Sequence, residues 1–419
     1  MIFIRTYNQN VNNLLPKLNK KQVKTVKRRA VIAGIIIVVI MLFFVVFYFL
    51  TRPLGHLEVL FNKELPFKVQ TVTIDPSGSH IMFGSPEGKL LIMSDRGVET
   101  ANIEIGYQVL ELTLIPESQV VVRTSSGLTC YTYDGKKSWE YKVSEYYPEV
   151  LQVLPRSKMG IYMRSLKGEK PLVSILNSQN GKEFKRLKLE IDAFDIQPAF
   201  TPDGEYVLFE VQPGMLAKIG LSPELPIQWK TFLDTKNGRF RNLSIKVTNS
   251  NLVVCHFNQD SEAPNNTVVE WPLFVIDGEK EPKGTNGTVE MPLFWQTMLT
   301  GPIGRIEIDS ELDTILVQAG TIYIFNRNGE QIKKEEDGSL YYFASLGNHN
   351  RFVSAFFLDA QSATNSSIQF VAKGISQEGV LWRFTETREY ILPAISADCE
   401  TLLLASMEKQ RITLLRLSQ

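Results

Sequence analysis

Cysteine and histidine are scarce in this chain of 419 residues, which holds three cysteines and four histidines. Cys130, Cys255 and Cys399 lie far apart and form no Cys-x-x-Cys pair, so the sequence has neither a disulfide framework nor a structural zinc site. The histidines are scattered, and no His-x-x-x-His or His-Glu-x-x-His spacing is present for a zinc enzyme. We therefore predict no metal site and expect each cysteine to be a small buried apolar residue.

Recognisable catalytic motifs are also missing. The chain has no Gly-x-Ser-x-Gly elbow, and its glycines fall in turns between strands rather than in the strand-to-helix loops that bind phosphate. Cys255 and His256 are neighbours, but adjacent residues of a strand point to opposite faces, which argues against a nucleophile–base pair. We therefore predict no catalytic residues, no cofactor and no enzymatic activity.

Acidic residues are absent before Glu58, whereas residues 1–29 carry eight of the 45 basic side chains. A basic arm can bind nucleic acid, but this one is followed at once by an uncharged apolar run, Val31–Leu50. As a helix rising 1.5 Å per residue, such a run has a length of about 30 Å, the thickness of the hydrocarbon core of a bilayer. No small-residue cleavage site follows it. We therefore predict a transmembrane signal anchor over residues 30–51 and no nucleic-acid binding.

The distribution of charge also predicts the orientation of the chain. Basic residues beside a membrane span stay on the cytoplasmic side. We accordingly expect a cytoplasmic tail of residues 1–29 and an exported domain of residues 52–419. The expected location is the bacterial inner membrane, with the N-terminus in the cytoplasm and the large domain in the periplasm.

Helical periodicity is missing beyond residue 55. Short runs rich in Val, Ile, Leu, Phe and Tyr recur instead between Gly, Pro, Asn and Asp, a pattern typical of strands joined by turns. The clearest copies of a repeat are TVTIDPSGSHIMFG from Thr71 and PAFTPDGEYVLFE from Pro198. Weaker copies surround Pro116, Pro155, Asn249, Ser310, Gly347 and Ala397. Their spacings of 37 to 61 residues bracket the roughly 40–50 residues of a four-stranded propeller blade.

The number of copies predicts an all-β fold, a β-propeller of eight four-stranded blades. Seven blades, or two stacked β domains, are the alternatives. The last copy has room for only three strands, and residues 56–65 form an unassigned strand before the first copy. Pairing of these two ends would close the ring and leave no open sheet edge. In that strand we expect the apolar set Leu57, Val59 and Phe61 to face the core.

The segment Tyr133–Glu140, YDGKKSWE, resembles the turn and tryptophan of a quinoprotein-like (PQQ-like) repeat, and Trp229 and Trp382 occupy comparable positions late in their blades. The Pro-Asp-Gly copies resemble a TolB-type repeat, and the overall pattern is similar to WD40-like propellers. This resemblance implies a propeller over residues 56–419 whose tryptophans dock on the neighbouring blade. It implies little about activity. A PQQ-dependent dehydrogenase of this superfamily has an adjacent cysteine pair, which this chain lacks.

The fifth repeat unit, Asn249 to Ser310, is the longest and includes two polar, turn-rich segments, Asn258–Thr267 and Asp277–Thr288. Aromatic residues lie between and after these segments. Two interpretations stay open, because the aromatics belong either to the blade core or to a partner-binding surface framed by inserted loops. The second interpretation makes four residues candidates for partner binding: Trp271, Phe274, Phe294 and Trp295.

The preferred hypothesis is a non-enzymatic, membrane-anchored propeller that serves as a scaffold or protein-binding module in a cell-envelope complex. Its partners are then the membrane and other envelope proteins. The alternative is an exported enzyme or small-ligand sensor that uses the central channel of the propeller. Convergent ionisable groups in the channel would favour the alternative, and exposed apolar patches would favour the scaffold.

Overall fold

The computed structural model divides into two units, Met1–Leu54 and Gly55–Gln419, which we describe separately. It describes residues 32–34, 36–43, 55–189, 198–212, 214–222, 227–233, 240–260, 270–280, 293–309, 314–335, 341–348, 350–358, 367–376, 379–387, 391–407 and 409–418. In the first unit residues 32–34 and 36–43 are helical, and the remaining positions of the predicted span lie outside the described residues. Within the residues described, none of the helical segments reaches the length and apolar character that crossing a bilayer requires.

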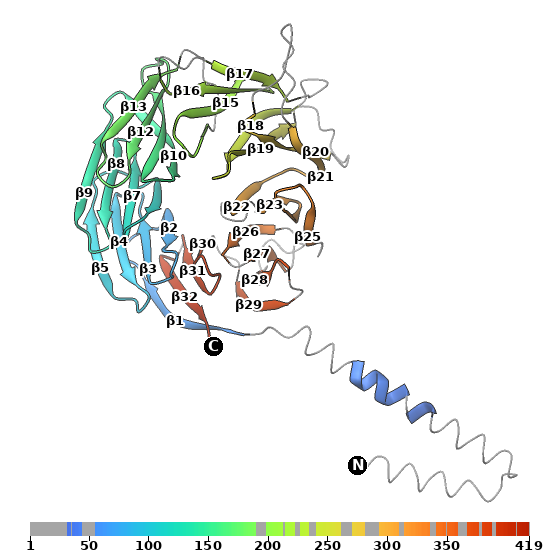
Figure 1. Cartoon of the computed structure of the whole chain (residues 1–419). Helices are drawn as coiled ribbons and strands as arrows, with labels where there is room; N and C mark the ends of the chain where they lie inside the picture. The colour runs from blue at the N-terminus through green and yellow to red at the C-terminus, as the bar shows by residue number, and fades with distance from the viewer. Residues whose placement is uncertain are drawn as a thin grey trace, which may run out of the picture. The chain divides into compact units, whose positions relative to one another are not determined.

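The described residues of the second unit form eight antiparallel sheets of four strands each, arranged as a ring around a central opening (Figure 1). Seven of the sheets are meanders in chain order, and the eighth combines strands from both ends of the unit. The predicted eight-blade propeller is thereby confirmed, and seven blades and stacked β domains are excluded.

The first four blades follow one another along the chain. Blade 1 comprises β2 (Thr71–Ile74), β3 (His80–Gly84), β4 (Lys89–Ser94) and β5 (Glu99–Glu104). Blade 2 comprises β6 (Glu111–Ile115), β7 (Gln119–Thr124), β8 (Gly127–Thr132) and β9 (Lys137–Lys142). Blade 3 comprises β10 (Tyr146–Leu154), β11 (Lys158–Ser165), β12 (Leu172–Asn177) and β13 (Glu183–Lys188). Blade 4 comprises β14 (Ala199–Phe200), β15 (Tyr206–Gln212), β16 (Met215–Gly220) and β17 (Ile227–Phe232).

The remaining four blades complete the ring. Blade 5 comprises β18 (Phe240–Val247), β19 (Leu252–Asp260), β20 (Glu270–Asp277) and β21 (Leu293–Thr300). Blade 6 comprises β22 (Arg305–Asp309), β23 (Thr314–Ala319), β24 (Thr321–Phe325) and β25 (Gln331–Glu335). Blade 7 comprises β26 (Tyr341–Gly347), β27 (Arg351–Phe357), β28 (Ser367–Gly374) and β29 (Val380–Thr387). Blade 8 comprises β30 (Ile391–Ile395), β31 (Thr401–Ser406), β32 (Arg411–Leu417) and β1 (Leu57–Glu64).

The hydrophobic core is divided among the interfaces between blades. Among the described residues each of the eight interfaces contains one cluster of buried apolar side chains. Strand β31 shows the principle, because Leu402 and Leu404 pack toward blade 7 whereas Leu403 and Ala405 pack toward blade 1. Both faces of a middle strand are covered, so these strands are continuous apolar runs rather than alternating ones.

Strand β1 closes the ring by pairing with β32, in a register that runs from Leu57 opposite Leu417 to Glu64 opposite Arg411. The predicted joining of the two ends is therefore confirmed. The predicted inward set is wrong at Val59, whose side chain is 55% exposed. The register shifts between Val59 and Phe61, and such a bulge breaks strict alternation. As a result Leu57 packs toward blade 7 and Phe61 toward blade 1, on opposite faces of the sheet.

Tryptophans on outer strands dock on the following blade, as the resemblance to PQQ-like repeats implied. Trp139 of blade 2 donates its indole N–H to the carbonyl of Ser178 in blade 3, at 2.9 Å. Trp382 of blade 7 donates to the carbonyl of Cys399 in blade 8, at 2.7 Å. Each bond satisfies a ring nitrogen that packing would otherwise leave without a partner. The side chain of Trp229 lies outside the described residues.

Candidate functional site

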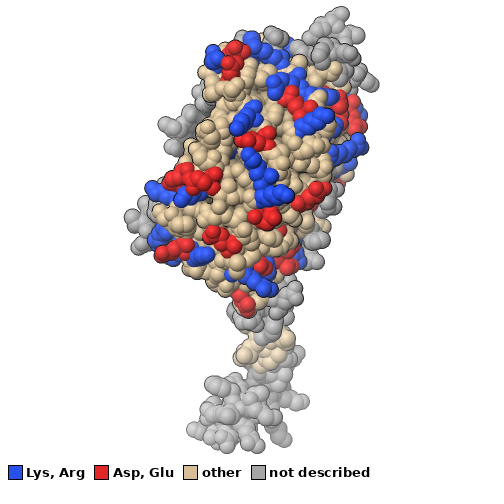
Figure 2. All heavy atoms as spheres, turned by 90° about the vertical axis from the view of Figure 1, so that its left-hand side faces the viewer, with Lys and Arg blue, Asp and Glu red and all other residues tan. Residues whose placement is uncertain are grey.

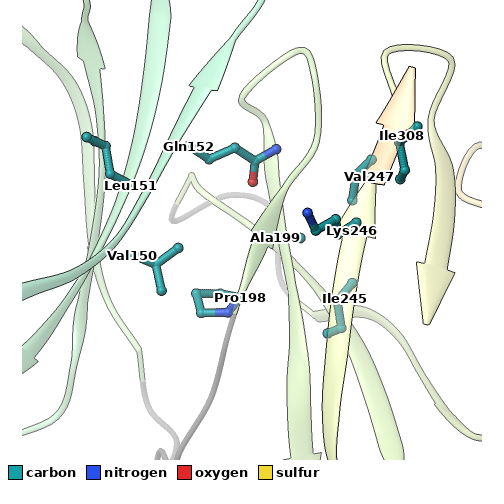
Figure 3. Close-up of a pocket in the computed structure, with 9 residues that line it drawn as sticks. All are labelled: Val150, Leu151, Gln152, Pro198, Ala199, Ile245, Lys246, Val247 and Ile308. Carbon is teal, nitrogen blue, oxygen red and sulfur yellow. The ribbon is translucent and has the colours of Figure 1, made fainter. Parts of the chain in front are cut away.

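The first strand of each blade is the innermost, because first strands of neighbouring blades contact one another around the opening. Four consecutive innermost strands, β10, β14, β18 and β22, line a cavity of about 340 Å³ (Figure 3). Its lining is mainly aliphatic and consists of Val150, Leu151, Gln152, Pro198, Ala199, Ile245, Lys246, Val247 and Ile308. Lys246 is the one charged residue in this lining, and Figure 3 shows its side chain extending from β18 into the space among the strands.

An innermost strand has one edge with no sheet partner, and side chains from the preceding blade form hydrogen bonds with backbone groups of that edge. The Gln152 amide accepts from the N–H of Phe200 at 2.8 Å and donates to its carbonyl at 3.2 Å. The carboxylate of Glu210 accepts from the N–H of Leu243 at 2.8 Å. These polar groups satisfy backbone groups that would be costly to leave unpaired, so their role is structural.

A second cavity, of about 460 Å³, lies between blades 5 and 6 and shares Lys246 with the first. Its lining consists of Ser244, Lys246, His256, Ile303, Gly304, Arg305 and Ile306. Three of these side chains, Lys246, His256 and Arg305, can carry positive charge. The alternation of β18 and β19 explains the grouping, because Ser244 and Lys246 lie on one face of the sheet and His256 is paired with Ser244 in the register.

His256 is buried, with 4% of its surface exposed, and burial lowers its pKa to about 4, with a smaller contribution from the charge of Lys246. The ring is therefore neutral at pH 7. Its Nδ1 lies 3.3 Å from the carbonyl oxygen of Phe257. Since a carbonyl only accepts, the neutral ring carries its proton on Nδ1 and keeps a lone pair on Nε2.

Lys246 and Arg305 differ in their partners. The Arg305 guanidinium binds the carboxylate of Glu307 through Nε at 3.0 Å and through Nη2. Within the part of the chain that the structure describes, the Lys246 ammonium has no hydrogen-bond or ion-pair partner. Burial by the surrounding protein lowers the pKa of Lys246, and the charge of Arg305 lowers it further. The carboxylate of Glu307 raises this pKa and partly offsets the two effects. Because the side chain is exposed to solvent, screening by water limits this effect.

The cysteines do not take part in this site. Cys255 is buried between blades 4 and 5, on the face opposite His256, which confirms that the two neighbours point apart. Burial raises the pKa of Cys255, and it raises the pKa values of Cys130 and Cys399 to about 12. A thiol in such surroundings is inert. Among the described residues no group of three His, Cys, Asp or Glu side chains could hold a metal ion.

The four candidates for partner binding lie in different environments. Trp271 is buried between blades 5 and 6, and Phe274 is buried between blades 4 and 5, each with 6% exposure. For these two the core interpretation holds, and they offer no surface to a partner. Trp295 docks on blade 6, where its indole N–H donates to the carbonyl of Arg327 at 2.9 Å. Phe294 is 38% exposed.

Phe294 is accompanied by two further exposed apolar residues of β21, Leu293 at 41% and Met298 at 52%. Sequence reasoning missed these two and also Lys246 and Arg305, and it considered His256 only as a possible partner of Cys255. One signal for Lys246 was present, a single lysine inside the apolar strand LSIKV. Residues 261–267 and 281–288, which make up most of the two inserted polar segments, lie outside the described residues.

Comparison with known proteins supports the fold. No protein-family model matches the sequence, and no curated protein matches it. The C-terminal WD40 domain of Sif2 is similar in structure, with a TM-score of 0.59 and 10% identity, over 88% of this chain and all of that one. Sqt1 of Saccharomyces cerevisiae has a TM-score of 0.56 and 11% identity, also over 88% of this chain and all of that one.

A third similar structure has a lower TM-score. BamB of Moraxella catarrhalis shows 14% identity and a TM-score of 0.42, over 86% of this chain and 97% of that one. A TM-score of 0.42 supports no conclusion about this chain. The Sif2 and Sqt1 similarities support the β-propeller fold, and at such low identity they support the fold alone.

Proposed function

We propose that this protein is a non-enzymatic scaffold, anchored to a membrane by a helix over residues 30–51, whose propeller binds other proteins of a cell-envelope complex. The observation that carries the proposal is the position of β1 in the chain. Only six residues separate the end of the apolar run at Leu50 from Leu57, where the strand that closes the ring begins. A short linker thus joins the anchor to a strand that is held by antiparallel pairing on β32.

The orientation rests on charge. Eight basic residues precede the apolar run, and the first acidic residue, Glu58, lies beyond it. Basic residues next to a span are retained in the cytoplasm, so the propeller is exported, into the periplasm if the membrane is a bacterial inner membrane.

The partner surface of the scaffold is the outer strand of blade 5. Phe294, Leu293 and Met298 are each exposed on this strand, and exposed apolar groups mark interaction sites. The side of the ring shown in Figure 2 differs, because lysine and arginine are interspersed with aspartate and glutamate over it. On the outer strands of blades 2 and 3 several charges are paired, such as Lys137 with Glu140 and Arg186 with Glu183. Mixed charges of this kind keep a surface soluble.

Membrane extraction and end-labelling test the anchored arrangement. The full chain should stay in the membrane pellet through a carbonate wash and should leave it with detergent. A tag before Lys17 should be protected from externally added protease in spheroplasts, and a tag after Gln419 should be digested. Release of the chain by carbonate would refute the anchor, and the opposite protection pattern would refute the orientation.

A further inference from the structure

Of the two cations that line the cavity between blades 5 and 6, Lys246 has no hydrogen-bond or ion-pair partner among the described residues. Lys246 and Arg305 contribute two cations, while Glu307 is the carboxylate bound to Arg305. Glu307 is also engaged on its other oxygen, which accepts from the Ser345 hydroxyl at 2.8 Å and the N–H of Leu346 at 2.9 Å. Its carboxylate is therefore fully used in joining blade 6 to blade 7 and to Arg305.

Three other cations at blade interfaces have partners in the protein, unlike Lys246. The buried Lys218 donates to the carbonyl of Gly278 at 2.8 Å. Arg123 binds Glu111 at 2.7 Å and the carbonyl of Pro148 at 2.9 Å. Lys333 donates to the carbonyl of Gly374 at 2.8 Å. A cation that stabilises the fold is held in this way, and Lys246 is not.

Neutral groups around Lys246 also suit an anion. The Ser244 hydroxyl lines the same cavity and has no hydrogen-bond partner among the described residues. His256 is neutral at pH 7, so it adds no charge and presents a polar edge. An ammonium, a guanidinium and a hydroxyl together supply the donors that a carboxylate accepts.

The adjoining cavity is apolar where it meets Lys246. Ile245 and Val247 flank the lysine on β18, and Val150, Pro198 and Ala199 face it from blades 3 and 4 (Figure 3). Apolar walls combined with a few convergent polar groups are the usual composition of a small-molecule site, and the volumes of about 340 and 460 Å³ lie in the range of such sites.

We propose that the central opening of the propeller binds a small monocarboxylate with an aliphatic tail. Lys246, Arg305 and Ser244 hold the carboxylate, and the half-buried aliphatic side chains of the adjoining cavity, Val150, Leu151 and Ile308, contact the tail. The proposal is independent of the scaffold role, since it concerns the channel rather than the outer strands, and either one can fail without the other.

Titration calorimetry on the full detergent-solubilised chain tests the site with three probes, which are octanoate, acetate and inorganic phosphate. Octanoate should bind more tightly than acetate, because acetate has no tail to contact the apolar cavity. Lys246→Met keeps the apolar stem and removes the charge, and it should weaken octanoate binding by at least about tenfold. Lys142→Met is the matched control, since Lys142 lies on an outer strand with a 77% exposed side chain, and it should bind octanoate as the wild type does.

Equal octanoate affinity in Lys246→Met and wild type overturns the assignment of the carboxylate, as does the absence of binding to the wild type. Phosphate or acetate binding as tight as octanoate overturns the assignment of the tail. A measurement on the unmodified chain covers the case in which Lys246→Met fails to fold. Octanoate should slow the acetylation of Lys246 by an amine-reactive reagent, followed by peptide mass spectrometry, and should leave Lys142 unaffected. An unchanged rate at Lys246 contradicts the proposal.

Discussion

Phe61 is the residue through which the closing strand packs on blade 1, and its truncation tests how the ring is held shut. The ring of Phe61 is partly buried in the cluster between blades 8 and 1. It lies over the turn of blade 1, where a Cβ at Gly97 would come within 3.2 Å of it. Truncation of a fully buried phenylalanine costs about 3–5 kcal/mol. For a half-buried ring we expect Phe61→Ala to lower the free energy of unfolding by about 2 kcal/mol.

The assay is urea denaturation of the full chain, followed by tryptophan fluorescence, with Val59→Ala as the matched control. Val59 lies on the same strand but is 55% exposed, and such surface substitutions change stability by no more than about 0.5 kcal/mol. A loss confined to Phe61→Ala supports closure by packing of β1 on blade 1. Equal effects of the two substitutions, or none from Phe61→Ala, would refute this reasoning.

Two further predictions concern single side chains of blade 5. Trp295→Ala should lower the free energy of unfolding, measured in urea, by about 2 kcal/mol, roughly half the cost of truncating a buried tryptophan. The reason is that the Trp295 ring packs on Gly329 and its N–H donates to the carbonyl of Arg327. Unchanged stability would mean that docking of Trp295 on blade 6 contributes nothing. Since the pKa of His256 falls from 6.5 to about 4 on folding, the unfolded chain takes up the proton first as the pH drops. About 3 kcal/mol of stability is then lost between pH 6.5 and pH 4. His256→Gln should lack this part of the pH dependence, and a variant that keeps the wild-type slope contradicts it.

The blades could be predicted from the sequence because their signals are local. Proline and glycine in the turns of Pro76–Gly78 and Pro202–Gly204 mark the inner hairpins, and both glycines adopt positive φ, 72° and 68°. The count of strands in the last repeat then implied the pairing of β1 with β32. No long-range information was needed for either inference.

Features that depend on neighbouring blades could not be predicted. The sequence could not assign Trp271 and Phe274 to the core or to a partner surface. A blade buries both faces of its middle strands, so the alternation of side chains along such a strand does not separate core residues from surface residues. The prediction that Val59 faces the core was wrong because a bulge shifts the register of β1. The cavity at Lys246 combines strands of four blades, and no spacing along the chain brings their residues together.

Capture of partners from membranes tests the scaffold function most directly. Full-length wild type, Phe294→Ser and Phe184→Ser would be purified by a C-terminal tag from gently solubilised membranes and compared by quantitative mass spectrometry. Phe184 is the control, since it is 52% exposed on the outer strand of blade 3. We expect stoichiometric capture of envelope proteins with wild type and Phe184→Ser, and a several-fold loss of these proteins with Phe294→Ser. Recovery of the wild-type chain alone, or equal capture by all three, would contradict it.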